Sequence, residues 1–186
     1  MLVLESQLIP VTQLKAERID AIRKAAKDRL LELAEAALGK DKRLIIRDLT
    51  PLDLEATNNE WVETSGTDNQ WSDTTITGTL ADNRFVVIIG VKIIDGHTTP
   101  PISALKFTVG GSEVARWDMY PAFKLYILTT SGAINHENPL CIAEAPIFIS
   151  QNIPFTVAEY VLETTTAYVA ALIGLVCEPE GKVLKG

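Results

Sequence analysis

The sequence predicts a mainly β fold, an antiparallel β-sandwich preceded by one long amphipathic N-terminal α-helix. Three observations support this class. One segment near the start has helical periodicity, about eight short apolar runs follow after residue 72, and no helix-length segment separates those runs. Strands without intervening helices cannot form parallel βα units, so we expect antiparallel sheets. Turn residues at short and fairly even intervals favour a jelly roll within this class.

The helix is predicted over residues 14–38. Its apolar positions recur at an average of about 3.6 residues, the period of an α-helix. Thr12 is expected to cap the N-terminus, and Gly39 stands where a C-terminal glycine belongs. The apolar face has to leave water, so we expect it to be buried against another chain or against the outside of its own sandwich. The candidate interface residues on this face are Ile19, Ile22, Leu30 and Leu33.

Alternation along residues 102–109 identifies a strand with one buried face. Leu105, Phe107 and Val109 point one way and are all apolar, whereas the opposite face is mixed. Gly110–Gly111 follows directly and supplies the tolerance of positive φ that a two-residue hairpin turn demands. We therefore expect a hairpin here rather than a phosphate-binding loop, whose longer glycine motif is missing from the sequence.

The run from Phe85 to Ile89 is apolar on both faces. A strand of this kind has to be covered on both sides, by the second sheet and by the helix or another subunit. The predicted core takes residues from this run and from later strands. It comprises Phe85, Val87, Ile89, Leu105, Phe107, Val109, Leu125, Ile127, Phe148, Val157, Val169 and Leu172.

Composition and charge divide the chain. We expect residues 1–50 to form an N-terminal helical arm, residues 51–72 a polar connecting segment and residues 73–186 the β-sandwich domain. The first 50 residues hold 10 Lys/Arg against 8 Asp/Glu, and the remaining residues hold 7 against 16, which together give the net charge of -7. Nucleic-acid binding requires cations that neutralise phosphates, so we expect a protein partner and no nucleic acid.

The hydropathy pattern does not suggest a membrane protein. No apolar run in the sequence approaches the ~20 residues that a membrane-spanning helix needs. The first ten residues lack the basic start of a signal peptide. We therefore expect no membrane association and synthesis in the cytoplasm.

The residues that could carry chemistry are few and scattered. The two histidines, His97 and His136, fall in separate loops, whereas a metal site needs several convergent ligands. Cys141 and Cys177 lie far apart in strand-like runs and are expected to be buried free thiols. The chain has no GxSxG motif. We expect no catalysis, no metal and no cofactor.

Two surface features remain as candidates for binding. One loop between apolar runs is stiffened by two prolines, and we expect it at the end of the sandwich, available for subunit contact. It consists of His97, Thr98, Thr99, Pro100 and Pro101. A second possibility is an aromatic platform for carbohydrate, although aromatic rings more often serve as core or interface anchors. It would consist of Trp61, Trp71, Trp117 and Tyr120.

The C-terminal half of the chain resembles virion structural proteins of bacterial and archaeal viruses. The likeness is carried by the glycine hairpin followed by Trp-Asp in "ISALKFTVGGSEVARWDMYP", by "EAPIFISQNIPFTV" and by the terminal strand ending "GLVCEPEGK". The last two are similar to single jelly-roll capsid proteins and to the β-sandwich cement (decoration) proteins of phage heads. The resemblance covers about half of the chain and carries over no functional residue.

This resemblance implies a non-catalytic capsid or cement subunit, made in the host cytoplasm and located in the virion. Such a subunit would self-associate, as a dimer or trimer, and bind capsid shell proteins. The alternative from a different class is a carbohydrate- or receptor-binding β-sandwich module. A concave cleft lined by exposed aromatic side chains would distinguish the second function from the first.

Overall fold

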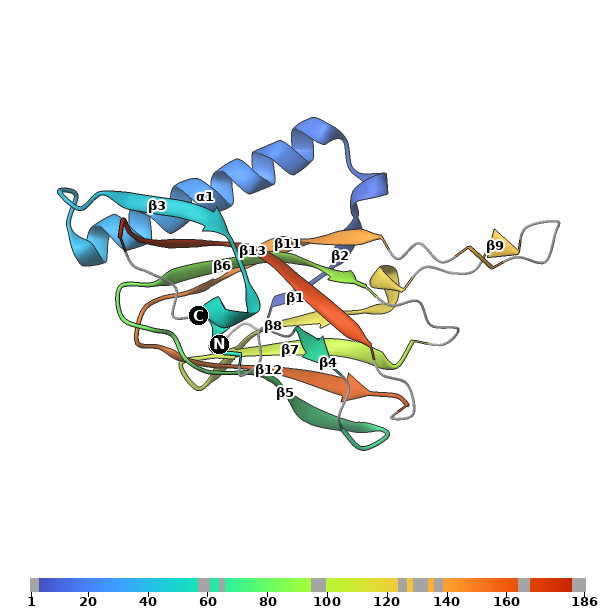
Figure 1. Cartoon of the computed structure of the whole chain (residues 1–186). Coiled ribbons are helices and arrows are strands. Elements are labelled where there is room, and N and C mark those ends of the chain that lie inside the picture. The colour runs from blue at the N-terminus through green and yellow to red at the C-terminus, as the bar shows by residue number, and fades with distance from the viewer. Residues whose placement is uncertain are drawn as a thin grey trace.

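The computed structural model describes residues 4–56, 61–63, 66–94, 100–123, 127–128, 134–135, 139–163 and 168–181. Two β-sheets pack face to face, and the single long helix α1 (Ala16–Leu38) crosses the outer face of one of them (Figure 1). The predicted class, an antiparallel β-sandwich with one long N-terminal helix, is confirmed.

Almost every strand belongs to one of two sheets. Sheet 1 contains, in spatial order, β1 (Leu4–Ser6), β8 (Ser112–Asp118), β7 (Ile102–Val109), β12 (Pro154–Val161) and β5 (Gln70–Thr79). Sheet 2 contains β2 (Leu8–Pro10), β11 (Leu140–Ile149), β6 (Phe85–Ile93), β13 (Val169–Pro179) and β3 (Leu44–Asp48), and β4 (Val62–Glu63) also pairs with β13. Within both sheets every pair is antiparallel except β1 with β8.

Eight of these strands are wound as a jelly roll. Taken along the chain, they are β3, β5, β6, β7, β8, β11, β12 and β13. The first pairs with the last, the second with the seventh, the third with the sixth and the fourth with the fifth. Sheet 2 holds the first and third of these pairs, and sheet 1 holds the other two. A long antiparallel hairpin rolled into two sheets has this pairing, which defines the jelly roll.

The winding places tight turns at one end of the sandwich and longer connections at the other. The tight end joins β5 to β6, β11 to β12, and β7 to β8, the last through Gly110 and Gly111 at φ 61° and 77°. The predicted hairpin is therefore present. The opposite end, called here the loop end, carries the connections that follow β3, β6, β8 and β12. The two-stranded pair β9 (Ile127–Leu128) and β10 (Ile134–Asn135) projects from this end (Figure 1).

The first 50 residues contribute strands as well as the helix. β1 and β2 lie on the edges of sheets 1 and 2, and β3 lies on the other edge of sheet 2. β1 and β2, of three residues each, are too short to show a period in the sequence. The helix starts at Ala16, after Lys15 as its N-cap residue, and ends before Gly39 at φ 90°. Thr12 lies instead in a short 3-10 turn, Val11–Gln13.

The apolar interior has two parts, one between the sheets and one between sheet 2 and α1. Of the predicted core residues, those that are buried are Phe85, Val87, Ile89, Leu105, Phe107, Val157 and Leu172. Three are half-buried, namely Val109, Phe148 and Val169. Leu125 and the side chain of Ile127 lie outside the described residues.

Truncation of Phe107 tests the core between the sheets. Its side chain is 1% exposed, and its ring centroid lies 4.5 Å from that of Trp117. We expect Phe107→Ala to lower the free energy of unfolding by about 3–5 kcal/mol in urea denaturation. Thr108→Ala, on the opposite face of the same strand, is the matched control and should cost less than about 1 kcal/mol. Equal losses in the two variants would contradict this packing.

Candidate functional site

The helix and the outer face of sheet 2 form the most distinctive surface of the molecule. Ala26, Leu30 and Ala34, spaced four residues apart, are the buried residues of α1. They pack in one cluster with the outward side chains of β6 and β13, among them Phe85 and Val87. Alanines at two of the three contact points allow the helix to approach the sheet closely, and full burial of Leu30 contributes roughly 1.5–3 kcal/mol. The chain's own helix thus supplies the cover that the doubly apolar strand β6 requires.

The predicted interface residues of the helix therefore differ in accessibility. Leu30 is fully buried within its own chain. Leu33 is half-buried beside the same cluster. Ile19 and Ile22 are also half-buried, and both line hollows beneath the N-terminal half of the helix. Of the four residues, Leu30 has no surface left for another chain.

Two hollows lie beneath the N-terminal half of α1, where the helix rises obliquely from the sheet (Figure 1). The β2-side hollow has a volume of about 340 Å³, and the β3-side hollow has a volume of about 370 Å³. Ile22 from the helix and Ile142 from β11 line both hollows. The two spaces therefore adjoin, and we call them together the helix groove.

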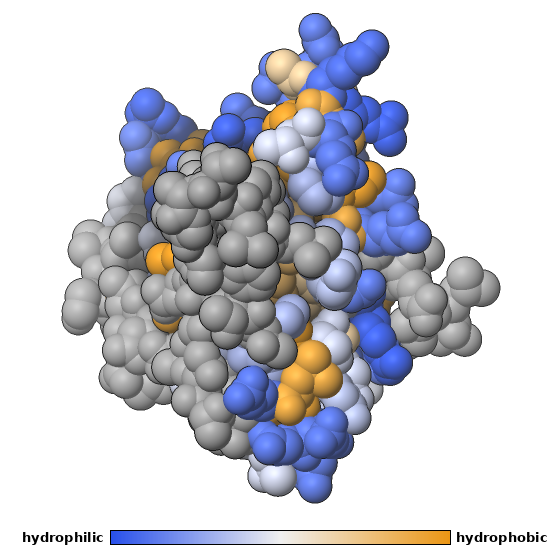
Figure 2. Space-filling view, turned by 90° about the vertical axis from the view of Figure 1, so that its right-hand side faces the viewer, coloured by the Kyte–Doolittle hydropathy of each residue, from blue (hydrophilic) through white to orange (hydrophobic). Residues whose placement is uncertain are grey.

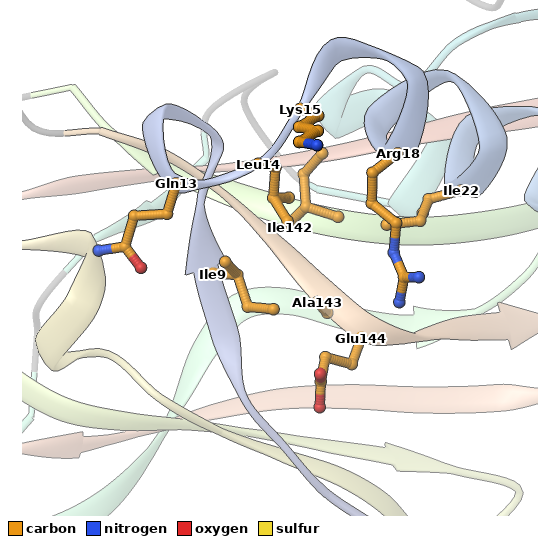
Figure 3. A pocket seen from close by; sticks show the side chains of 9 residues that line it. All are labelled: Ile9, Gln13, Leu14, Lys15, Arg18, Ile22, Ile142, Ala143 and Glu144. Atoms are coloured by element: carbon orange, nitrogen blue, oxygen red, sulfur yellow. The ribbon is translucent and has the colours of Figure 1, made fainter.

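The walls of the helix groove are mainly apolar. The β2-side hollow is lined by Ile9, Leu14, Ile22, Ile142 and Ala143, together with the polar residues Gln13, Lys15, Arg18 and Glu144 (Figure 3). The β3-side hollow adds Ile19, Trp61, Ile89, Leu140, Ala171 and Ile173. Seen from the loop end, apolar side chains emerge among the charged residues at the top of the molecule (Figure 2).

Charges differ between the two sides of the groove. On the β3 side, Arg23 Nη2 lies 3.3 Å from Asp48 Oδ1, and this exposed ion pair links α1 to β3. An exposed pair of this kind contributes at most about 1 kcal/mol. On the β2 side, Lys15 and Arg18 make no ion pair within the part of the chain that the structure describes. The β2-side mouth therefore carries two cations against the single carboxylate of Glu144.

A buried ionic cluster lies where β3 and β13 meet the segment that follows β3. Arg47 on β3 donates to both carboxylate oxygens of Asp53 at 2.7 Å, and its Nη2 donates to Glu178 Oε1 at 2.9 Å. Arg84 Nε donates to Glu178 Oε2 at 3.3 Å. Asp53 lies in the 3-10 helix Pro51–Leu54, so the cluster joins this helix to β3 and β13.

The electrostatics of this cluster are those of a structural site. Burial opposes the ionisation of Asp53, but hydrogen bonds from Arg47 and from the backbone and hydroxyl of Thr50 outweigh it and lower the pKa of Asp53 below 3.8. Hydrogen bonds to Asp53 and Glu178 raise the pKa of Arg47 against the effect of its burial. Both carboxylates of the cluster are thus held by guanidinium groups. The lowered pKa of Asp53 is unlike that of a general acid or base, which lies near neutrality.

The cysteines are free and buried, as the sequence suggests. Burial raises the pKa of Cys141 to about 12. Burial, with a smaller effect from nearby carboxylates, raises the pKa of Cys177 to about 11. Both thiols are therefore protonated at neutral pH and poor nucleophiles.

Parts of the histidine loops lie outside the described residues, namely His97, Thr98, Thr99 and His136. Pro100 is half-buried and Pro101 is buried. The carbonyl of Pro101 accepts hydrogen bonds from the amides of Leu162 at 2.7 Å and Glu163 at 3.2 Å. The C-terminal side of this loop is thus tied to the end of β12. Within the described ranges, no group of three or more His, Cys, Asp or Glu side chains could hold a metal ion.

The four aromatic residues of the predicted platform are not on one surface. Trp117 is buried in the core, Trp61 lines the β3-side hollow, and Tyr120 is exposed after β8. Trp71 is half-buried on the outer face of sheet 1, where its ring centroid lies 5.5 Å from that of Tyr160. Lys106 Nζ lies 4.5 Å from the Trp71 ring centroid, and Arg116 Cζ lies 5.4 Å from it.

Three comparisons, with protein-family models, with curated proteins and with solved structures, give no match. In the part of the chain that the structure describes, no helix is both long and apolar enough to span a membrane.

Replacement of Asp53 tests the ionic cluster. Asp53→Asn leaves buried guanidinium groups short of a partner, so we expect the free energy of unfolding at pH 7 to fall by about 3–5 kcal/mol. Because the folded-state pKa of Asp53 lies below 3.8, its contribution is present above pH 3.8 and is lost as the pH falls through the folded pKa. The difference in the free energy of unfolding between Asp53→Asn and wild type should therefore shrink at the most acidic points of a series of unfolding curves measured at different pH.

Asp48→Asn is the matched control, since its side chain is 82% exposed in its pair with Arg23. It should change the free energy of unfolding by less than about 1 kcal/mol. Stability losses of the same size at Asp48 and Asp53 would show that the buried cluster does not stabilise the fold.

Proposed function

We propose that this chain is a virion structural protein, a capsid or capsid-cement (decoration) subunit that self-associates and binds neighbouring shell proteins without catalysis. The jelly roll supports this function because it is a recurrent architecture of viral capsid domains. The buried ionic cluster and the helix layer also add contacts that stabilise the sandwich as one block. Such a block suits a subunit whose task is to hold a fixed geometry.

A surface observation carries the proposal. Among the described residues, the large apolar side chains that are exposed are Ile94, Tyr120 and Leu162. Each follows a different strand, namely β6, β8 and β12, and so each lies at the loop end. Isolated exposed apolar residues are normal, but their restriction to one end favours a contact surface there. The loop end is therefore the proposed assembly surface, and it includes the half-buried Pro100.

Assembly of the purified chain tests this function. We expect a dimer, a trimer or larger shell-like particles by light scattering and negative-stain electron microscopy, and co-sedimentation with virus particles. Leu162→Glu should prevent assembly and leave the circular dichroism spectrum unchanged. Lys42→Glu, exposed at the opposite end, is the control and should assemble like wild type. A protein that stays monomeric at every concentration and binds no particle would contradict the proposal.

The second candidate function is a carbohydrate- or receptor-binding module. It is favoured by the Trp71–Tyr160 pair on the outer face of sheet 1, where Lys106 and Arg116 add positive charge beside the indole ring. Aromatic faces with adjacent cations could hold an acidic sugar by stacking and by charge.

A glycan array separates the two functions. If this surface binds sugar, labelled wild-type protein should retain acidic glycans, and Trp71→Ala should lose them while keeping its melting temperature. Tyr120→Ala, an aromatic change away from this surface, is the matched control and should bind as wild type does. An array without bound glycan, or equal binding by Trp71→Ala, would exclude this function.

A further inference from the structure

The helix groove is a large apolar space covered by the protein itself. Its two hollows, of about 340 and 370 Å³, each reach the size at which small-molecule sites begin, roughly 300 Å³. Aliphatic side chains that line a hollow make fewer dispersion contacts than closely packed ones. The part of α1 from Ala26 onward shows that the helix can pack closely on this sheet, through Ala26, Leu30 and Ala34. The separation under the N-terminal half therefore points to an occupant.

The shape of the groove restricts what could occupy it. The floor is sheet 2, with Ile142 and Ile173, and the roof is α1, with Ile19 and Ile22. The Arg23–Asp48 ion pair also links the helix to β3 on one side. A helix or strand from another protein could not enter without displacing α1. A slender and flexible apolar chain could follow the two adjoining hollows, which share Ile22 and Ile142 as lining residues.

The charges around the groove would give a bound hydrocarbon chain a direction. Lys15 and Arg18 stand at the β2-side mouth without ion-pair partners among the described residues, and Glu144 is the single carboxylate there. Arg18 points along the wall of this hollow toward Glu144 in Figure 3. At the other mouth, Arg23 is already paired with Asp48. An anionic head would therefore be held at the β2 side, with its tail running toward Trp61.

We propose that the helix groove binds one single-chain anionic amphiphile, such as a long-chain fatty acid. Its hydrocarbon chain lies between α1 and sheet 2, and its head group lies beside Lys15 and Arg18. A carboxylate and a phosphate monoester meet the same requirement, so a free fatty acid and a lysophospholipid are two sources of one chemistry. This inference does not depend on the function proposed above, because it concerns a different surface of the molecule.

The binding test uses the full-length protein and a fluorescent probe, dansyl-undecanoic acid. We expect saturable binding of one probe per chain, with displacement by oleate and by lysophosphatidate in parallel arms that identify the preferred head group. Methyl oleate, which lacks the charge, should displace the probe at least about tenfold less well. Native mass spectrometry of the purified protein should show the mass of one bound amphiphile.

Variants locate the probe. Ile22→Trp fills both hollows and should weaken binding by about tenfold or more, because the hydrocarbon chain loses its buried surface. Ala171→Met fills the β3-side hollow from the sheet and should also weaken binding of the probe. The test therefore does not depend on correct folding of Ile22→Trp alone. Arg18→Glu should weaken binding of the anionic probe by about tenfold. Lys27→Glu is the matched control, being exposed on α1 and outside both hollows, and should bind as wild type does.

Several outcomes would overturn the proposal. One is the absence of saturable binding to wild-type protein. Another is full binding by a folded Ile22→Trp or Ala171→Met variant, since the hydrocarbon chain of the probe would then lie outside the helix groove. If Arg18→Glu and Lys27→Glu bind the probe with equal affinity, the head group does not lie at the β2-side mouth. Sedimentation with phosphatidylglycerol vesicles, in protein that binds no monomeric probe, would indicate a membrane-binding surface instead of a ligand site.

Discussion

The structure is organised around the need to cover both faces of β6. Val86 and Ile88 face sheet 1, and Phe85, Val87 and Ile89 face α1. A central strand that is apolar on both sides cannot belong to a two-layer sandwich with one wet face, so a third layer is required. The helix is that layer, and it packs residues 16–38 on the outer face of sheet 2.

A glycine limits how far this double burial extends. A Cβ at Gly90 would lie 2.2 Å from the carbonyl oxygen of Cys141, so only glycine permits this close approach of β11. The register of β6 shifts here, and beyond it Val91 and Ile93 face the core while Lys92 is exposed. The strand thus changes from a helix-covered to a solvent-facing exterior within a few residues.

The helix layer and the ionic cluster are held to the sandwich in different ways. The cluster fixes a short 3-10 helix against β3 and β13 through paired, buried charges, which leaves that flank rigid. The buried residues of the helix, Ala26, Leu30 and Ala34, lie from its middle toward its C-terminal end, so its N-terminal half has fewer contacts to hold it. An occupant of the groove would stabilise this half by mass action and couple ligand binding to the position of the helix. The loop end, where the assembly surface is proposed, is separate from both.

Periodicity and turn chemistry are local properties, and the sequence by itself determined what depends on them. These are the helix near residues 14–38, the Gly110–Gly111 hairpin, the doubly apolar run at Phe85 and the sandwich class. Only the tertiary structure decided which surface covers that run, because an apolar stripe looks the same whether its partner is the same chain or another. It also decided the ionic cluster and the helix groove. Arg47 and Glu178 are 131 positions apart, and their pairing depends on how strands distant in the sequence come together, which no local pattern encodes.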